Sequence, residues 1–214
     1  MQIKHPFFSG LLLSLGAFSA GLALAASPQS LDVQRRWDQS NFVQAGAAQK
    51  QAMEQLVTEC DELTVVQPAD TELLTWCGIA NSSYAGLASA FSAMKYAKAA
   101  RGMLEEALEL SADGTNGAAR TSLGALYFKV PGWPLGFGDK DKARALLEEG
   151  LAINPQNIDA NFFYADFLLE QKELTLARVH LERALLAPAR PGREVADEGR
   201  RKAVQALLAD LDTQ

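Results

Sequence analysis

The chain has 214 residues, of which 48% are hydrophobic and 21% charged, so it can bury an ordinary core and is not a disordered chain. Its 26 acidic residues outnumber its 20 basic residues, which gives a formal net charge of −6. A chain this acidic has no general electrostatic attraction to nucleic acid or to anionic lipid, and we expect no nucleic-acid partner.

The amino end has the layout of a secretory signal peptide. Lys4 precedes an apolar run over residues 7–26, and the run ends with Ala23 and Ala25 in an A-x-A arrangement. This pattern predicts cleavage near Ala25; the alternative is an uncleaved anchor, because about twenty apolar residues can just span a bilayer. No cysteine follows the run to carry a lipid. We expect a periplasmic protein without stable membrane insertion after cleavage.

The rest of the chain predicts helices separated by turn formers. Apolar residues recur at helical spacing from Val33 to Leu63, and Pro68 ends this segment. Asp139 is expected to be an N-cap, because its short carboxylate accepts a bond from an amide two or three residues further on. The later helices are predicted over residues 71–87, 97–110, 118–129, 139–153, 159–171, 174–186 and 194–211.

Three segments repeat one spacing of small and large residues. The pattern Ala-x3-Leu-x2-Ala/Gly begins at Ala100, Ala143 and Ala177, and the last two copies are 34 residues apart. A small residue in an apolar helix precedes each copy: Gly78, Gly124 and Ala165. Antiparallel helices can approach closely at small side chains, and hairpins built this way stack to bury their remaining apolar faces.

These residues resemble the tetratricopeptide repeat, a 34-residue helical hairpin that often carries a proline near its end, as Pro155 does here. The resemblance covers 71–188 and implies an all-α fold of stacked hairpins in a short solenoid. We therefore expect a signal peptide over 1–25, an N-terminal helical segment over 26–70, three hairpins over 71–188, and a C-terminal capping helix over 189–214.

Two of the repeats are longer than the standard unit. The small residues of the two helices lie 22 positions apart from Gly78 to Ala100 and 19 apart from Gly124 to Ala143, whereas the third unit has the standard spacing of 12. We expect both insertions to form long connections between the two helices of their hairpin.

Three stretches support a narrower resemblance: residues 127–171, an upstream ECDEL segment at 59–63, and residues 187–208. They look like the TatT-like proteins, the tetratricopeptide-type T component associated with some TRAP transporter systems. This resemblance implies an exported, non-enzymatic helical protein that binds a periplasmic solute-binding partner or holds an apolar ligand. TatT-like members are often lipid-anchored, and the chain departs from them by lacking the required cysteine.

The connection at 130–139 contains two prolines, three glycines and two aromatic residues. Gly136 and Gly138 do not form a phosphate-binding turn, because a helix rather than a strand precedes them and Asp139 places an anion at the end. Asp139 and Asp141 alone supply too few oxygen ligands for a metal loop.

Two interpretations of Trp133 and Phe137 stay open: they cap the apolar end of their own hairpin, or they form the lip of a binding groove. The resemblance assigns the following residues to a concave wall: Thr75, Ile79, Ser82, Thr121, Ala125, Phe128, Lys129, Asp159, Phe162, Asp166, Leu169 and Glu170. Phe128 and Phe162 can equally be core residues. The candidate binding residues are Trp133, Phe137, Phe128, Lys129, Phe162 and Asp166.

Catalytic groups are scarce after the predicted signal. His180 is the one histidine there, and a lone helical histidine is typically a packing or surface residue. With no second histidine and no C-x-x-C motif, the usual zinc ligand sets are absent, and we expect no enzyme, cofactor or metal. Cys60 and Cys77 flank a predicted turn, so they form either a disulfide, which export permits, or two buried thiols.

We therefore expect a binding protein. The leading hypothesis is an exported adaptor that uses its concave face and the 130–139 loop to hold a periplasmic protein partner, such as a TRAP-type solute-binding protein. The alternative is a carrier that encloses an apolar small molecule between the loop and Phe128 and Phe162.

Overall fold

A computed structural model describes residues 26–113 and 115–213, and within them the chain is all-α, as the sequence predicted. The predicted signal peptide lies outside the described residues. The described helices are α1 (Pro28–Phe42), α2 (Gly46–Val66), α3 (Thr71–Leu87), α4 (Ala90–Leu110), α5 (Ala118–Lys129), α6 (Lys140–Ile153), α7 (Ile158–Glu170), α8 (Leu174–Leu185) and α9 (Glu194–Asp212).

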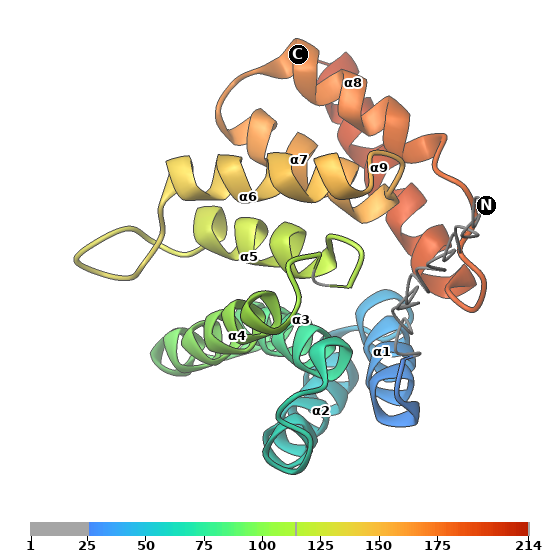
Figure 1. Ribbon diagram of the computed structural model, residues 1–214. Coiled ribbons are helices and arrows are strands. Elements are labelled where there is room, and N and C mark those ends of the chain that lie inside the picture. The colour runs from blue at the N-terminus through green and yellow to red at the C-terminus, as the bar shows by residue number, and fades with distance from the viewer. Residues whose placement is uncertain (1–25, 114, 214) are drawn as a thin grey trace, which may run out of the picture.

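Three antiparallel hairpins, α3–α4, α5–α6 and α7–α8, follow one another along the chain and stack into a curved array (Figure 1). The pair α1–α2 precedes the first hairpin, and α9 packs on α7 and α8 after the last. The curvature brings the two ends of the array together, because α9 also contacts α1.

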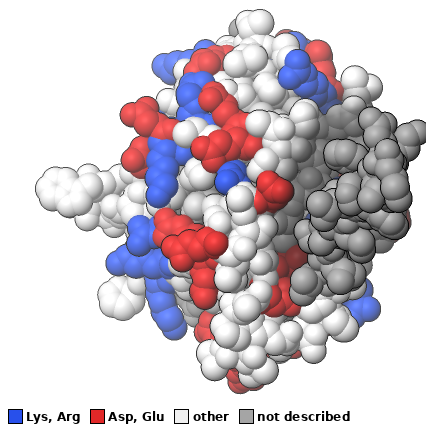
Figure 2. All heavy atoms as spheres, in the orientation of Figure 1, with Lys and Arg blue, Asp and Glu red and all other residues white. Residues whose placement is uncertain are grey.

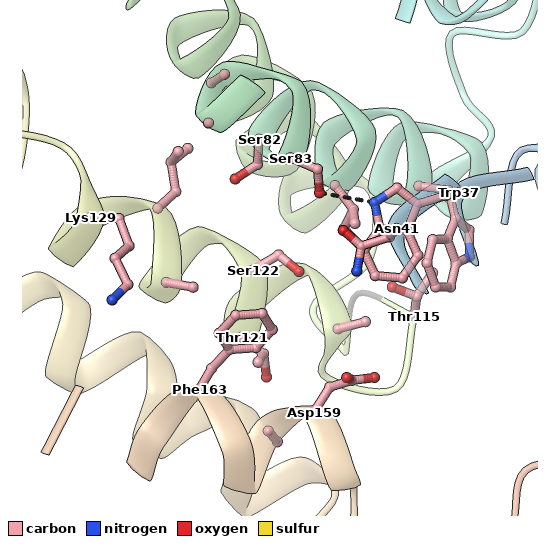
Figure 3. Close-up of a pocket in the computed structure, with 18 of the residues that line it drawn as sticks. Trp37, Asn41, Ser82, Ser83, Thr115, Thr121, Ser122, Lys129, Asp159 and Phe163 are labelled. Atoms are coloured by element: carbon pink, nitrogen blue, oxygen red, sulfur yellow. Dashed lines mark hydrogen bonds between the residues drawn. The ribbon is translucent and has the colours of Figure 1, made fainter. Parts of the chain in front are cut away.

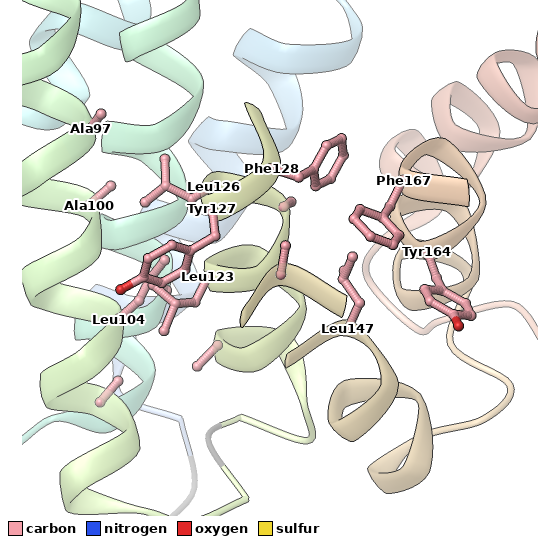
Figure 4. Close-up of a cluster of buried hydrophobic side chains, with 14 of the residues drawn as sticks. Ala97, Ala100, Leu104, Leu123, Leu126, Tyr127, Phe128, Leu147, Tyr164 and Phe167 are labelled. Carbon is pink, nitrogen blue, oxygen red and sulfur yellow. The ribbon is translucent and has the colours of Figure 1, made fainter. Parts of the chain in front are cut away.

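Small residues set the spacing within the hairpins. A Cβ atom added to Gly78 would lie 2.7 Å from Leu104 Cγ, and one added to Gly124 would lie 2.8 Å from Leu147 Cγ. Figure 4 shows Leu104 of α4, Leu123 of α5, Leu147 of α6 and Phe167 of α7 in one buried cluster. The small residues in the repeat pattern are thus sites of helix–helix contact, as the sequence analysis expected.

The expected long connection in the first hairpin is wrong. α3 ends at Leu87 and α4 begins at Ala90, so only two residues join them, and the ten extra residues lengthen the two helices. The segment from Ile79 to Lys98 has no proline and a single glycine, and its alanines and other helix-compatible residues continue the helical pattern. The 130–139 insertion does form a long connection, because its prolines and glycines prevent helix.

The N-terminal segment also differs from the expected single helix over 33–63. It forms two helices, which break at residues 43–45. Gly46 at the start of α2 has φ of +59°, a left-handed conformation that glycine adopts without strain. Cys60 on α2 and Cys77 on α3 are joined by a disulfide with both side chains fully buried, so α2 is fixed covalently to the first hairpin.

The Asp139 N-cap is confirmed. Its carboxylate accepts hydrogen bonds from the backbone amides of Asp141 and Lys142, both at 3.0 Å. Asn157 caps α7 and Asp70 caps α3 in the same way. These caps satisfy backbone donors that the first turn of a helix leaves free, and they fix where each helix starts.

Two glycine-to-alanine changes test the close packing. Gly124→Ala places a methyl group against Leu147 and the backbone of α6, and we expect the free energy of unfolding to fall by about 1–3 kcal/mol. Gly102→Ala, in the open middle of α4 with no atom within 4 Å, should raise it by about 0.5–1 kcal/mol. Urea unfolding measures both, and equal effects of the two changes would contradict the packing role of Gly124.

Candidate functional site

A cavity of about 880 Å³ opens on the concave side of the array. Residues of α1, α3, α5 and α7 line it (Figure 3). Gln49 of α2, part of α4 and the three arginines Arg190, Arg193 and Arg200 complete its walls. Apolar side chains make much of the lining, among them Trp37, Trp76, Met94, Leu126 and Phe163.

Hydroxyl and amide groups are interspersed among the apolar lining. Ser82 and Ser83 come from α3, Thr121 and Ser122 from α5, and Asn41 from α1 (Figure 3). The indole nitrogen of Trp37 donates a hydrogen bond to Ser83 Oγ at 2.9 Å, which fixes the Trp37 ring against the first hairpin. The cavity therefore offers both apolar contact and neutral hydrogen-bonding groups.

A buried ion pair closes the side of the cavity between α1 and the segment before α9. Arg193 Nε and Nη2 donate to the two Asp38 carboxylate oxygens at 2.7 and 2.9 Å, and both side chains are buried. The Arg193 guanidinium also lies 4.7 Å from the centre of the Trp76 ring. Burial raises the pKa of Asp38 above its ordinary value, although the charge of Arg193 opposes that shift.

A second group of charges ties α7 to the carboxyl end. Asp159 accepts hydrogen bonds from Arg190 and from Arg200, each at 2.7 Å. Arg190 also donates to Asp197 at 2.7 Å. Burial alone would raise the pKa of Asp159, but the charges of Arg200 and Arg190 outweigh it and hold that pKa well below its ordinary value.

The turn before α9 explains how two arginines reach these partners. Gly192 has φ of +75°, and the Arg193 amide donates to the Arg190 carbonyl at 3.0 Å. This left-handed turn favours glycine and reverses the chain. Arg190 and Arg193 both line the cavity, and Arg200 on the first half of α9 lines it as well.

Six residues of the predicted concave wall line the cavity: Ile79, Ser82, Thr121, Ala125, Lys129 and Asp159. Lys129 lies at its edge and forms ion pairs with Asp166 at 3.0 Å and with Glu170 at 2.8 Å. The structure thus brings together two of the candidate binding residues, Lys129 and Asp166, although only Lys129 belongs to the lining.

The two candidate phenylalanines do not line the cavity. Phe128 is buried in the core, with its ring edge-on to Phe167 at 5.6 Å between centroids. Phe162 is half-buried under the guanidinium of Arg200, at 4.2 Å from the ring centre. Phe163, the next residue on α7, faces the cavity instead (Figure 3).

The structure places Trp133 and Phe137 differently from each other. Phe137 packs on its own hairpin, with its ring edge-on to Tyr127 at 5.6 Å and the Arg101 guanidinium 4.5 Å from its centre. Trp133 is 90% exposed and does not reach the cavity. Val130 and Pro131, at the base of the loop, are the loop residues that do line it.

Sequence reasoning missed the contribution of α1 and of the C-terminal arginines. Asp38 and Arg193 are 155 residues apart, and no local pattern relates them. The cluster of arginines around Gly192 was a signal that could have indicated a turn with a structural or binding role.

His180 has the packing role that a lone helical histidine predicts. It is buried, its Nδ1 lies 3.0 Å from Asn161 Oδ1, and its ring is edge-on to Tyr164. Burial lowers its pKa below the ordinary value. Among residues 26–113 and 115–213, no three His, Cys, Asp or Glu side chains gather in a way that could hold a metal ion.

Comparison with protein families gives a tetratricopeptide repeat match over residues 135–211. Residues 135–211 are therefore similar to the tetratricopeptide repeat. The match spans α6 to α9, and the same hairpin arrangement continues toward the amino end through α5 and the pair α3–α4. Comparison with curated proteins gives no match.

TPR repeats are generally non-catalytic and hold protein partners, so the family match favours an interaction adaptor. The cavity lies against the first helices of the three hairpins, α3, α5 and α7. The helices of the described TPR-like chain include none long and apolar enough to cross a membrane.

Removing the carboxylate from the buried ion pair should destabilise the fold. Asp38→Asn leaves the Arg193 charge buried without its partner, and we expect a loss of about 3–5 kcal/mol in the free energy of unfolding. Asp32→Asn on the same helix breaks only exposed ion pairs and should cost less than about 1 kcal/mol. Chemical denaturation measures both free energies of unfolding. Similar losses in the two variants would show that the buried pair contributes no more to stability than an exposed one.

The stabilising effect of Asp159 should depend on pH. Because its pKa is lower in the folded state, its contribution is fully present above the unfolded pKa, near 3.8, and is lost as the pH falls below that value. At pH 7, Asp159→Asn should therefore lower the free energy of unfolding by about 2 kcal/mol or more. The difference from wild type should stay nearly constant from pH 6 to about pH 4.5, and it should shrink only as the pH falls further, toward about pH 2.

Asp212→Asn is the control, because it removes only an exposed ion pair with Arg178. It should cost less than about 1 kcal/mol throughout. A difference between wild type and Asp159→Asn that stays constant with pH would contradict the assigned role of Asp159.

Proposed function

We propose that the protein is an exported, non-catalytic TPR-like adaptor that holds a segment of a periplasmic protein partner in its concave cavity. The single observation that carries this proposal is the cavity of about 880 Å³ on the wall where TPR arrays bind their partners. A TRAP-type solute-binding protein is the partner that the TatT-like resemblance suggests, and it is part of the proposal.

The charges in the cavity wall limit which partner segment fits. Arg193 is paired with Asp38, Arg200 with Asp159, and Lys129 with Asp166 and Glu170. An anionic group from a ligand would have to break one of these pairs and leave the carboxylate of that pair without its partner, which is unfavourable away from water. Glu72 also lines the cavity and would repel an anionic group. The segment held there therefore carries no anionic group, and its apolar side chains lie against Trp37 and Phe163.

Two features support export. The apolar run over residues 7–26 with its A-x-A end is typical of a secretory signal. The buried disulfide between Cys60 and Cys77 suits an oxidising compartment, because thiols in the cytosol are normally kept reduced.

A carrier of an apolar small molecule is the second candidate. The observation that favours it is closure: the contact of α9 with α1 turns the curved array into a ring around the cavity. The volume, about 880 Å³, falls in the range of about 300–1,000 Å³ that small-molecule pockets occupy. This cavity does not involve Phe128 or Phe162.

A single bulky substitution tests whether the cavity is the binding site. Ser122 is half-buried on α5 and faces the cavity (Figure 3), so Ser122→Trp should fill it and lower partner capture at least about tenfold. Thr58→Trp, exposed on α2 and outside the lining, is the control and should bind as wild type does. Capture from periplasmic extract by immobilised protein, followed by quantitative mass spectrometry, measures the change.

A photo-crosslinking residue at position 122 separates the two candidates. Under the adaptor proposal it traps one protein that the same residue at position 58 does not trap. Under the carrier alternative no protein is trapped, and native mass spectrometry of the purified protein shows a bound mass that Ser122→Trp removes. Unchanged capture by Ser122→Trp with equal crosslinking from both positions would overturn a role for the cavity.

A further inference from the structure

Three large apolar side chains project from one end of the molecule. Trp133 and Leu135, at the tip of the 130–139 loop, are 90% and 78% exposed, and Phe91 in the first turn of α4 is fully exposed. The loop extends beyond the body of the protein in Figure 1 and forms an isolated projection in Figure 2. Trp133 and Leu135 lie two positions apart in one loop, so their exposed apolar surface is not that of a single isolated side chain.

The loop and the start of α4 lie side by side. A Cβ atom at Gly136 would lie 2.9 Å from Met94 Cε, so the loop touches α4 at that point. Phe91 precedes Met94 by three residues and so lies on the same side of the helix. The three exposed side chains therefore belong to one end of the structure.

The loop is held in place by its own contacts. The Gly138 amide donates to the Pro131 carbonyl at 2.9 Å, and the Asp139 amide donates to the Tyr127 carbonyl at 3.0 Å. Phe137, in the second half of the loop, packs against Tyr127. Since the base is fixed, the exposure of Trp133 is a feature of an ordered loop.

Basic side chains surround the base of this projection. Among the described residues, Lys95, Lys98 and Lys140 are without an ion-pair partner, and Figure 2 shows Lys and Arg on both sides of the loop. Arg101 and Lys142 share the single carboxylate of Glu105. Asp139 and Asp141 lie close by, so the base carries a moderate excess of positive charge on a chain that is acidic overall.

We propose that this end docks on the surface of an anionic lipid bilayer, with Trp133, Leu135 and Phe91 in the headgroup region and Lys95, Lys98 and Lys140 facing lipid phosphates. Tryptophan prefers the membrane interface, where its ring is in apolar surroundings and its N–H stays hydrated. Lysines close to an anionic surface add attraction over about one Debye length, so the distant acidic residues oppose it little.

The shape of the surface favours a bilayer over a protein. Trp133 and Leu135 belong to the loop and Phe91 to α4, so the apolar groups come from separate elements, whereas protein interfaces are built from contiguous complementary surfaces. A fluid bilayer can accommodate separate projections, and the basic residues lie behind them, at the depth of the headgroups. This docking is peripheral, without a membrane-spanning helix, and does not rest on the proposed function of the cavity.

Tryptophan fluorescence offers a direct test, because Trp37 and Trp76 are buried and Trp133 is the exposed tryptophan of the described chain. The protein used is the chain from residue 26, which contains every described helix and lacks the apolar run that would itself bind lipid. With vesicles of equal parts phosphatidylcholine and phosphatidylglycerol, we expect a blue shift and quenching by lipids brominated near the headgroup.

Vesicle sedimentation measures the partition coefficient of variants. Trp133→Ala/Leu135→Ala should lower it at least about tenfold. Lys95→Gln/Lys98→Gln/Lys140→Gln should lower it about tenfold or more on these vesicles, and much less on pure phosphatidylcholine. Val65→Ala/Val66→Ala, at the exposed end of α2, is the matched control and should bind as wild type does.

Circular dichroism checks that each variant is folded. Because the substituted side chains are exposed, we expect all the variants to fold as the wild type does. The proposal is overturned if the wild-type protein does not sediment with the vesicles, or if the control variant loses as much binding as the loop variant. It is also overturned if brominated lipid leaves Trp133 unquenched. A protein partner for the loop would give the first of these outcomes.

Discussion

The closed shape of the molecule is held where α1 meets the carboxyl end, by the ion pair between Asp38 and Arg193 and by the close packing of Phe42 on Gly199. A stack of three hairpins would by itself be an open curved array, with its concave face exposed along its whole length. The Asp38–Arg193 pair joins the first helix to the turn before the last one, and the packing of Arg193 on Trp76 adds to it. Both charges are buried, so an arrangement that separates them leaves each without its partner. The pair therefore favours the closed arrangement over an open one.

The cavity follows from two constraints acting together. Close approach at Gly78 and Gly124 sets the helices of each hairpin side by side, so that the first helices α3, α5 and α7 form a continuous inner wall. The ion pairs then bring α1 and α9 across the open side. Those same pairs neutralise the arginines that face the cavity, so these arginines stabilise the fold, and the cavity offers a ligand mainly apolar and neutral polar groups together with the carboxylate of Glu72.

The two insertions in the repeats have opposite structural effects. In the first hairpin the added residues extend α3 and α4, which lengthens the wall and presents Phe91 at its end. In the second, prolines and glycines produce a projecting loop whose base lines the cavity while Trp133 points away from it. If the loop rests on a bilayer as proposed, the cavity would be held close to a membrane, where an adaptor could meet partners that work at that surface.

The sequence alone determined the features that depend on near neighbours: the all-α fold, the hairpin pattern, the cap at Asp139 and the position of the long loop. It also indicated much of the inner wall, because repeat positions are periodic along a helix. Only the tertiary structure decided that α9 returns to α1, that Phe163 rather than Phe162 faces the cavity, and that Phe128 belongs to the core. These outcomes depend on how small rotations accumulate from hairpin to hairpin, and on contacts such as Asp38 with Arg193 between residues far apart in the chain.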